Sequence, residues 1–314
     1  MSRPLDRRSF LKAGALVGLT PFVPRTLIAD ALSEKAALPA VTANPQVAIV
    51  KGTDYNKATV KALELLGGMR HFVTRNATVG LLINSRYDKP GTFVKPEIAL
   101  AVLKMCLDAG AAKIYTIEGV SQSYWSRSDL SGKFKEEIKS IQGGNDQFAE
   151  VEIPKGVSLK KTEITRAYLD CDVLINLPIV KDHEGIRTTG SLKNVMGATS
   201  YSTNRYFHLG SGASGYYDDV QWLSQCIVDA NLLRKPTLCV MDATEFIVTN
   251  GPFGPGKIMK GQKVIAGADP VAVDAVGARL LGLNPRDVVK IRLAHEQGLG
   301  QMQTEGMRIE EAEV

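Results

Sequence analysis

The stretch EITRAYLDCDVLINLPIV (163–180) decides the fold class. Residues 163–171 carry apolar side chains at helical spacing, and residues 172–180 form a nearly continuous apolar run of strand length. A strand that is apolar on both faces must be buried on both faces, which is typical of parallel sheets covered by helices. The stretch therefore indicates an α/β protein.

The same alternation of helix and strand continues on both sides of this stretch. Further apolar strands are predicted at 46–50, 78–84, 113–119, 237–244 and 263–269. Helices are predicted at 59–68, 96–110, 129–141, 218–233, 270–282 and 285–298. Residues 148–154 alternate with a period of two, which predicts an edge strand. Because crossovers between parallel strands are right-handed, the pattern favours a doubly wound α/β fold, a mostly parallel sheet with helices on both faces.

The composition is that of a globular chain and excludes several classes of protein. Of 314 residues, 44% are hydrophobic and 23% are charged, which argues against a disordered chain. The first 31 residues carry five basic and two acidic side chains, which leaves 33 basic and 31 acidic ones elsewhere. That near balance provides no electrostatic argument for a nucleic-acid partner. We expect one α/β domain at 46–300, a linker at 32–45 and a C-terminal tail at 301–314.

Residues 1–31 resemble a twin-arginine export signal. DRRSFLK (6–12) contains the arginine pair Arg7-Arg8, and an apolar run too short to span a bilayer follows at 13–19. Residues 29–31, Ala-Asp-Ala, supply a cleavage site. We therefore expect export of the folded chain to the periplasm by the twin-arginine translocase, with no stable transmembrane helix in the mature chain. An amphipathic N-terminal helix is the alternative interpretation.

Two glycine-rich stretches match phosphate-binding motifs incompletely. GPFGPGK (251–257) fits the start of a P-loop, but Ile258 stands where Ser or Thr would hold magnesium, and two prolines remove N–H donors. A Gly/Pro-rich hairpin or lid is the better interpretation. GSGASG (210–215) has the spacing of a dinucleotide fingerprint, but no convincing strand precedes it. We expect a flexible loop there, in which the backbone at Gly210 and Gly212 can contact an anion.

The densest group of polar side chains follows the buried strand at 172–180. Ligands of open α/β sheets bind beyond the carboxyl ends of the strands, so this region is the expected site. A short helix starting near residue 189 or 191 would bring its own polar residues back over the strand end and present backbone N–H groups to a ligand. We expect catalytic roles for Lys181, His183, Lys193 and Asn194, and anion binding by Thr189, Gly190, Ser191, Gly210 and Gly212. A polar surface loop with chance charges is the alternative.

Acidic residues at strand ends are candidate metal ligands. Glu118 and Asp242 each end a predicted strand, and His208 is a further candidate ligand. We expect Asp242 to share one cleft with Lys181 and the rest of the polar group. A divalent metal is therefore one expected cofactor, although the sequence does not identify the cofactor.

Three runs of sequence resemble the Domain of Unknown Function 362 family. They are NLPIVKDHEGIRTTGSLKNVMG (176–197), VMDATEFIVTNGPFGPG (240–256) and VIAGADPVAVDAVGARLLG (264–282), within a resemblance that covers roughly residues 46–300. The resemblance implies an α/β architecture and settles no reaction. The polar residues of this chain that match the family by position are Lys181, His183, Lys193, Asn194, Asp242, Asp269 and Asp274. Of these, Asp269 precedes Pro270 and is expected to cap a helix.

The cysteines separate this chain from the family members that carry iron–sulfur centres. The chain has four cysteines and no C-x-x-C pair: Cys106, Cys171, Cys226 and Cys239. Ligation of an iron–sulfur cluster needs closely spaced thiolates. We therefore expect no iron–sulfur cluster in this chain. Two functions remain open: an exported enzyme acting on a small carboxylate or phosphate, and a non-catalytic partner or assembly subunit of a periplasmic iron–sulfur or cytochrome redox complex.

Overall fold

The computed structural model describes residues 46–142, 147–209 and 219–314. The twin-arginine stretch and the linker lie outside these residues, as do Gly210 and Gly212. Among the helices of the described ranges, none is long and apolar enough to cross a membrane.

A seven-stranded sheet organises the domain, in the order β11-β1-β10-β9-β6-β2-β3. Its strands are β1 (Val47–Lys51), β2 (Thr78–Ile83), β3 (Lys113–Thr116), β6 (Val173–Leu177), β9 (Leu238–Ile247), β10 (Ile258–Gly267) and β11 (Ile309–Glu313). Neighbouring strands from β9 to β3 are parallel, as are β1 and β11, while β10 runs antiparallel between β1 and β9. The expected mostly parallel sheet is confirmed.

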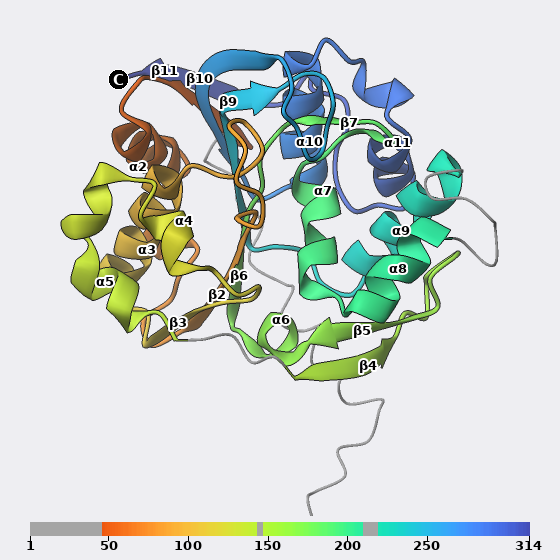
Figure 1. Ribbon diagram of the computed structural model, residues 1–314, viewed down its shortest axis with the longest axis horizontal. Helices are drawn as coiled ribbons and strands as arrows, with labels where there is room; N and C mark the ends of the chain where they lie inside the picture. Colours follow the sequence, from red (N-terminus) through yellow and green to blue (C-terminus); the bar gives the residue numbers. More distant parts are fainter. Residues whose placement is uncertain (1–45, 143–146, 210–218) are drawn as a thin grey trace, which may run out of the picture. The chain divides into compact units, whose positions relative to one another are not determined.

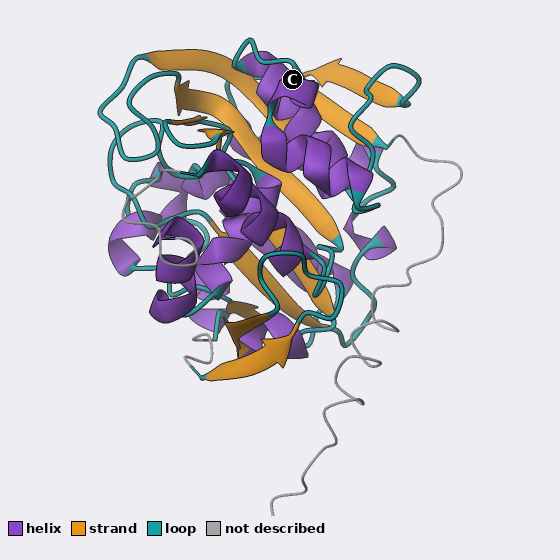
Figure 2. Cartoon of the chain, turned by 90° about the vertical axis from the view of Figure 1, so that its right-hand side faces the viewer, coloured by secondary structure: helices purple, strands orange, loops and turns teal. Residues whose placement is uncertain are grey.

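Helices cover both faces of the sheet, as the doubly wound fold requires (Figure 1). One face carries α2 (Tyr55–Leu65), α3 (Pro96–Ala109), α4 (Gln122–Trp125) and α5 (Lys135–Ser140). The other carries α7 (Ser191–Asn194), α8 (Tyr201–Leu209), α9 (Val220–Asn231), α10 (Pro270–Leu280) and α11 (Val289–Glu296), which lie in front of the strands in Figure 2. The short helix α6 (Arg166–Asp170) leads into β6. The single-turn 3₁₀ helices are η1 (Met69–His71), η2 (Asp129–Gly132), η3 (Val195–Ala198) and η4 (Pro285–Asp287).

Local sequence signals account for the element boundaries. Helix α3 begins at a proline and ends at Gly110, whose φ of 94° suits a residue without a side chain. Helix α10 begins after Asp269, whose carboxylate accepts the N–H groups of Val271 and Ala272, so the expected cap is confirmed. All five residues of β6 are buried between β2 and β9, in agreement with their apolar run.

Two segments lie elsewhere than the sequence indicated. Strand β4 (Phe148–Glu152) pairs with β5 (Lys161–Thr165) in a separate two-stranded sheet, so the helix expected from residue 163 starts later. Residues 309–313, expected in a tail, form β11 and pair with β1 along its whole length. The main sheet therefore extends past residue 300, because only a distant strand, β1, provides the hydrogen-bond partners of this segment.

Candidate functional site

One cavity collects most of the polar side chains that the sequence singled out. This cavity, which we call the lysine cavity, has a volume of about 450 Å³. Its walls come from the segments that follow parallel strands: 84–87 after β2, Glu118 after β3, residues 181–199 after β6 and residues 252–253 after β9. Helix α8 contributes a further wall. The cavity therefore lies where open α/β sheets bind their ligands.

Lys181 forms a fully buried part of the cavity wall. Its Nζ donates a hydrogen bond of 2.6 Å to the carbonyl of Thr92 and lies 4.4 Å from the centre of the Tyr87 ring. Burial, together with the charge of Lys193, lowers the pKa of Lys181 to about 7. At neutral pH this lysine therefore exists both with and without its proton.

Lys193 is a second lysine of the cavity wall. It is half-buried on α7 and lines the cavity. Within the described ranges its ammonium group has no hydrogen-bond or ion-pair partner. Burial and the charge of Lys290 lower the pKa of Lys193 to about 8, so most molecules are still protonated at pH 7.

The two histidines of the cavity are neutral at physiological pH. His183 is buried, and burial and the Lys193 charge lower its pKa to about 2. His208, on α8, has a pKa lowered to about 4 by the same two causes. The N–H of Gly185 donates to Nδ1 of His183, which places the hydrogen of the neutral ring on Nε2. Burial among cations therefore disfavours the charged form of His183.

Glu118 supplies the acidic group of the cavity. It is half-buried, and burial raises its pKa to about 7 against an opposing effect of Arg86. A Cβ atom on Gly197 would lie 2.7 Å from Oε2 of Glu118, so the glycine leaves room for the carboxyl group beside η3. The cavity thus holds a carboxyl group that can donate a proton at neutral pH.

Asn194, expected to be catalytic, and Thr189, expected to bind an anion, both form hydrogen bonds within the protein. Asn194 lines the cavity, but its amide donates to Oδ1 of Asn176 at 2.7 Å and to the carbonyl of Leu82 at 3.0 Å. The hydroxyl of Thr189 donates to the carbonyl of Ile179. These hydrogen bonds connect α7 and the segment before it to the ends of β2 and β6.

The N-terminus of α7 does not face a ligand, contrary to the expectation from its sequence. The N–H groups of Ser191 and Leu192 donate to the carboxylate of Asp274, which comes from α10. Gly190 lines the cavity with a φ of 130°, and a Cβ atom there would lie 2.5 Å from Oδ1 of Asp274. The anion that these N–H groups bind is therefore a side chain of the protein.

Asp242 does not share the cavity, and this corrects the expected metal site. It lies within β9, which continues to Ile247, and it is fully buried. Its carboxylate accepts hydrogen bonds from the N–H of Lys95, at 2.7 Å, and from Thr244. Lys95 is the N-cap residue of α3, on the opposite face of the sheet from α7.

The remaining candidate metal ligands do not form a complete site. Glu118 and His208 both line the cavity, but Asp242 cannot join them. Among the described residues no group of three or more His, Cys, Asp or Glu is placed to hold a metal ion.

The sequence patterns did not indicate several residues of the cavity, among them Arg86 and Tyr87, after β2, and Phe253, after β9. The first two follow a predicted apolar strand directly, so the carboxyl-end rule that selected Lys181 applies to them as well. Phe253 lies in the segment that matched a P-loop. Its position in the cavity wall depends on contacts between segments that are distant in the chain, and no local sequence pattern indicates such contacts.

The segment 251–257 is attached to the hairpin formed by β7 (Asp182–His183) and β8 (Arg187–Thr188). The N–H of Gly251 donates to Oδ2 of Asp182 at 2.9 Å, and the N–H of Glu184 donates to the carbonyl of Gly251. These bonds bring Pro252 and Phe253 to the lysine cavity.

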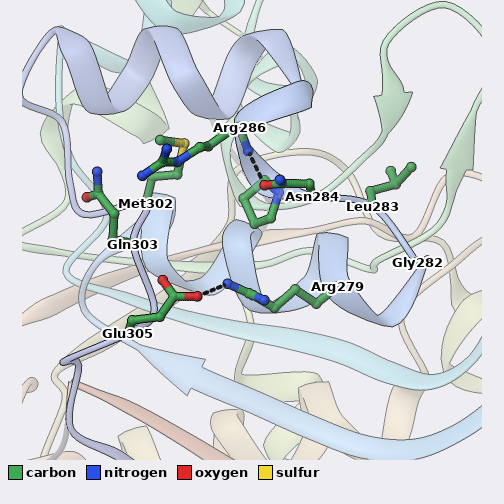
Figure 3. Close-up of a pocket in the computed structure, with 9 residues that line it drawn as sticks. Arg279, Gly282, Leu283, Asn284, Arg286, Met302, Gln303 and Glu305 are labelled. Carbon is green, nitrogen blue, oxygen red and sulfur yellow. Dashed lines mark hydrogen bonds and ion pairs between the residues drawn. The ribbon is translucent and has the colours of Figure 1, made fainter.

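A second cavity, of about 550 Å³, lies between α10, η4 and residues 302–305 (Figure 3). Arg279 and Glu305 form an ion pair of 2.6 Å across it, and both side chains are exposed to solvent. Its third charged residue, Arg286, is exposed as well. Because no titratable group is buried in the wall of this second cavity, the lysine cavity is the better candidate for chemistry.

The four cysteines are buried free thiols in separate parts of the fold: Cys106 in α3, Cys171 after α6, Cys226 in α9 and Cys239 in β9. Burial raises the pKa of each thiol, so the reactive thiolate form is disfavoured.

The family model described as "Domain of unknown function (DUF362)" matches residues 79–279, a span that contains the cavity residues from Asn84 to Phe253. The thylakoid-associated protein sll1697 of Synechocystis is 24% identical over 268 residues, which cover 81% of this chain and 79% of that protein.

Two solved structures are similar at low identity. The lactate racemase apoprotein of Thermoanaerobacterium thermosaccharolyticum has a TM-score of 0.44 at 14% identity, covering 76% of this chain and 57% of that chain. A protein of Thermotoga maritima has a TM-score of 0.37 at 12% identity, covering 77% and 58%. This chain thus spans less than two thirds of the length of either solved chain.

Proposed function

The chain belongs to the family described as "Domain of unknown function (DUF362)", and from this premise we propose that it is an enzyme that binds a small organic anion in the lysine cavity and transfers a proton to or from it. One observation carries the proposal. The unpartnered ammonium group of Lys193, among the residues that the structure describes, shares a cavity with Lys181 and Glu118, and both of these groups have pKa values near neutrality.

The charges of the cavity favour an anion. Arg86, Lys181 and Lys193 line it, against the single carboxyl group of Glu118 among its described residues. Hydrogen bonds from an ammonium group to a carboxylate or phosphate are about twice as strong as neutral ones. Lys193 meets this need, since its ammonium group lines the cavity and no described carboxylate forms an ion pair with it.

The titrating groups favour proton transfer. A general acid or base works best when its pKa lies near the operating pH. Lys181, with a pKa of about 7, accepts a proton in its neutral form, and Glu118, also with a pKa of about 7, donates one in its protonated form. The reaction class is therefore proton transfer at an atom of the substrate close to its anionic group.

Calorimetry with purified chain tests the binding step. We expect acetate, malonate and inorganic phosphate, titrated at pH 7, to reveal at least one ligand whose affinity falls tenfold or more in Lys193→Gln. Lys133→Gln, at an exposed position outside the cavity, is the matched control and should bind like the wild type. Equal affinities of the Lys193 and Lys133 variants would contradict the proposal.

Hydrogen exchange tests the catalytic step. In deuterated water, NMR should show exchange at a carbon-bound hydrogen of the bound organic anion. At saturating concentrations of the anion, Lys181→Met should slow this exchange at least tenfold. Binding without any enzyme-dependent exchange would reject catalysis and favour a binding protein, such as a partner subunit of a periplasmic redox complex.

We also propose that residues 1–31 direct export of the folded chain to the periplasm by the twin-arginine route. The support is the DRRSFLK stretch with the apolar run and the cleavage site that follow it.

A further inference from the structure

The mouth of the lysine cavity carries large apolar side chains although its wall is cationic. Phe253 is 51% exposed and Tyr201 is 79% exposed, and both line the cavity together with Tyr87. Apolar side chains that stay exposed beside a cavity commonly mark a ligand contact. The core does not account for them, because neither Phe253 nor Tyr201 is covered by it.

Two aromatic rings connect the exposed Phe253 to Lys181 in the cavity wall. Phe253 packs edge-to-face on Tyr87, with the ring centres 5.3 Å apart. The Tyr87 ring in turn lies 4.4 Å from Nζ of Lys181. Tyr87 thus contacts both the exposed ring of Phe253 and the buried ammonium group of Lys181.

The position of Phe253 is built into the fold. Gly251, two residues earlier, bonds to Asp182 through its N–H and to Glu184 through its carbonyl. A Cβ atom on Gly251 would lie 1.8 Å from the carbonyl oxygen of Asp182, so the two segments touch through their backbones. The hairpin that follows Lys181 therefore fixes the segment that carries the aromatic ring.

We propose that the ligand of the lysine cavity is an amphipathic organic acid, with a carboxylate that contacts Lys193 and a flat apolar body that packs against Phe253 and Tyr87. This inference rests on the proposed function and specifies its substrate class. A cavity of about 450 Å³ lies within the range of small-molecule sites, about 300–1,000 Å³, and suits an acid with a single aromatic ring. A bare inorganic anion would occupy the cationic wall and leave the aromatic mouth in water.

A series of carboxylates that differ only in their apolar body tests the inference. Acetate, butanoate, phenylacetate and 3-phenylpropanoate are titrated into the full chain by calorimetry at pH 7. We expect 3-phenylpropanoate to bind at least tenfold more tightly than acetate. Phe253→Ala should abolish most of this preference and change the affinity for acetate less than twofold. Phe148→Ala, at a 46% exposed position on β4, is the matched control and should keep the preference.

The outcomes separate this inference from the proposed function. Equal affinities for acetate and 3-phenylpropanoate, or a preference that Phe253→Ala leaves intact, would overturn the aromatic contact while dependence on Lys193 still supports an anion site. Binding that is unchanged in Lys193→Gln across the whole series would overturn the anion site itself. If an acetylated peptide ending in phenylalanine binds and 3-phenylpropanoate does not, the mouth receives a protein partner and the inference is wrong.

Discussion

Asp274 caps a helix that begins 83 residues before it, since its carboxylate accepts the N–H of Ser191 at the start of α7. It also lies 3.7 Å from Nζ of Lys290, and both side chains are almost completely buried. Lys290 donates in turn to the carbonyl of Thr189. The runs TTGSLKN (188–194) and ADPVAVD (268–274) lie in two of the three stretches that resemble the family, and the contact between Asp274 and Ser191 joins them at the start of the helix that carries Lys193.

Gly190→Ala should destabilise the protein by about 2–4 kcal/mol, because the position combines a positive φ with no space for a Cβ atom beside Asp274. Urea unfolding followed by circular dichroism measures the change. Gly119→Ala is the control, since no atom lies within 4 Å of its added Cβ. Similar losses of stability in both variants would contradict the close contact between Gly190 and Asp274.

Asp274→Asn should cost about 3–5 kcal/mol of stability, because it leaves the charge of Lys290 buried without its partner. Burial already raises the pKa of Asp274 and lowers that of Lys290, so each charge depends on the other. The double variant with Lys290→Met should recover part of the loss in the same unfolding experiment. The exposed pair gives the comparison: Glu305→Gln should cost less than about 1 kcal/mol. A double variant less stable than Asp274→Asn would argue against the pair.

The stability of the wild type should rise with pH above neutrality through Lys181. The folded chain releases the proton of this lysine at a pKa of about 7, whereas the unfolded chain keeps it up to the ordinary value of 10.5. Between these values the unfolded state binds more protons, so raising the pH favours folding, by at most about 1.4 kcal/mol per pH unit. Unfolding free energies between pH 7.5 and 9.5 should show this rise in the wild type and in Lys133→Met, and a smaller rise in Lys181→Met. Identical slopes in all three proteins would place the pKa of Lys181 outside this window.

Replacement of Arg7 and Arg8 by lysine should leave the chain unprocessed in the cytoplasm, since the twin-arginine receptor reads the arginine pair. Cell fractionation and immunoblotting of the precursor and mature forms measure the effect. Replacement of Arg3 by lysine, outside the DRRSFLK stretch, is the control and should not change export. Delivery of the double variant to the periplasm at the wild-type level would refute the export signal.

Local sequence determined the fold class and the region of the site. An uninterrupted apolar run such as β6 is stable only in a strand that is buried on both faces. Because helical segments separate these strands along the chain, the strands were expected to be parallel. The carboxyl ends of parallel strands meet at one edge of a sheet, so Lys181 and Lys193 could be assigned to one cavity from their positions along the chain. These conclusions depend only on the spacing of apolar residues and on the order of helices and strands, both of which can be read from the sequence.

Only the tertiary structure decided what each side chain contacts. The sequence indicated Asp242 at a strand end beside Lys181, yet β9 continues past it and its carboxylate binds the N-cap of α3, because the face to which a strand residue points depends on the neighbouring segments. The lowered pKa of His183 depends partly on the charge of Lys290, and the contact between Phe253 and Tyr87 joins two segments that are distant in the chain. A pKa and a hydrogen-bond partner are set by burial and by charges within a few ångströms, and the packed fold alone brings those groups together.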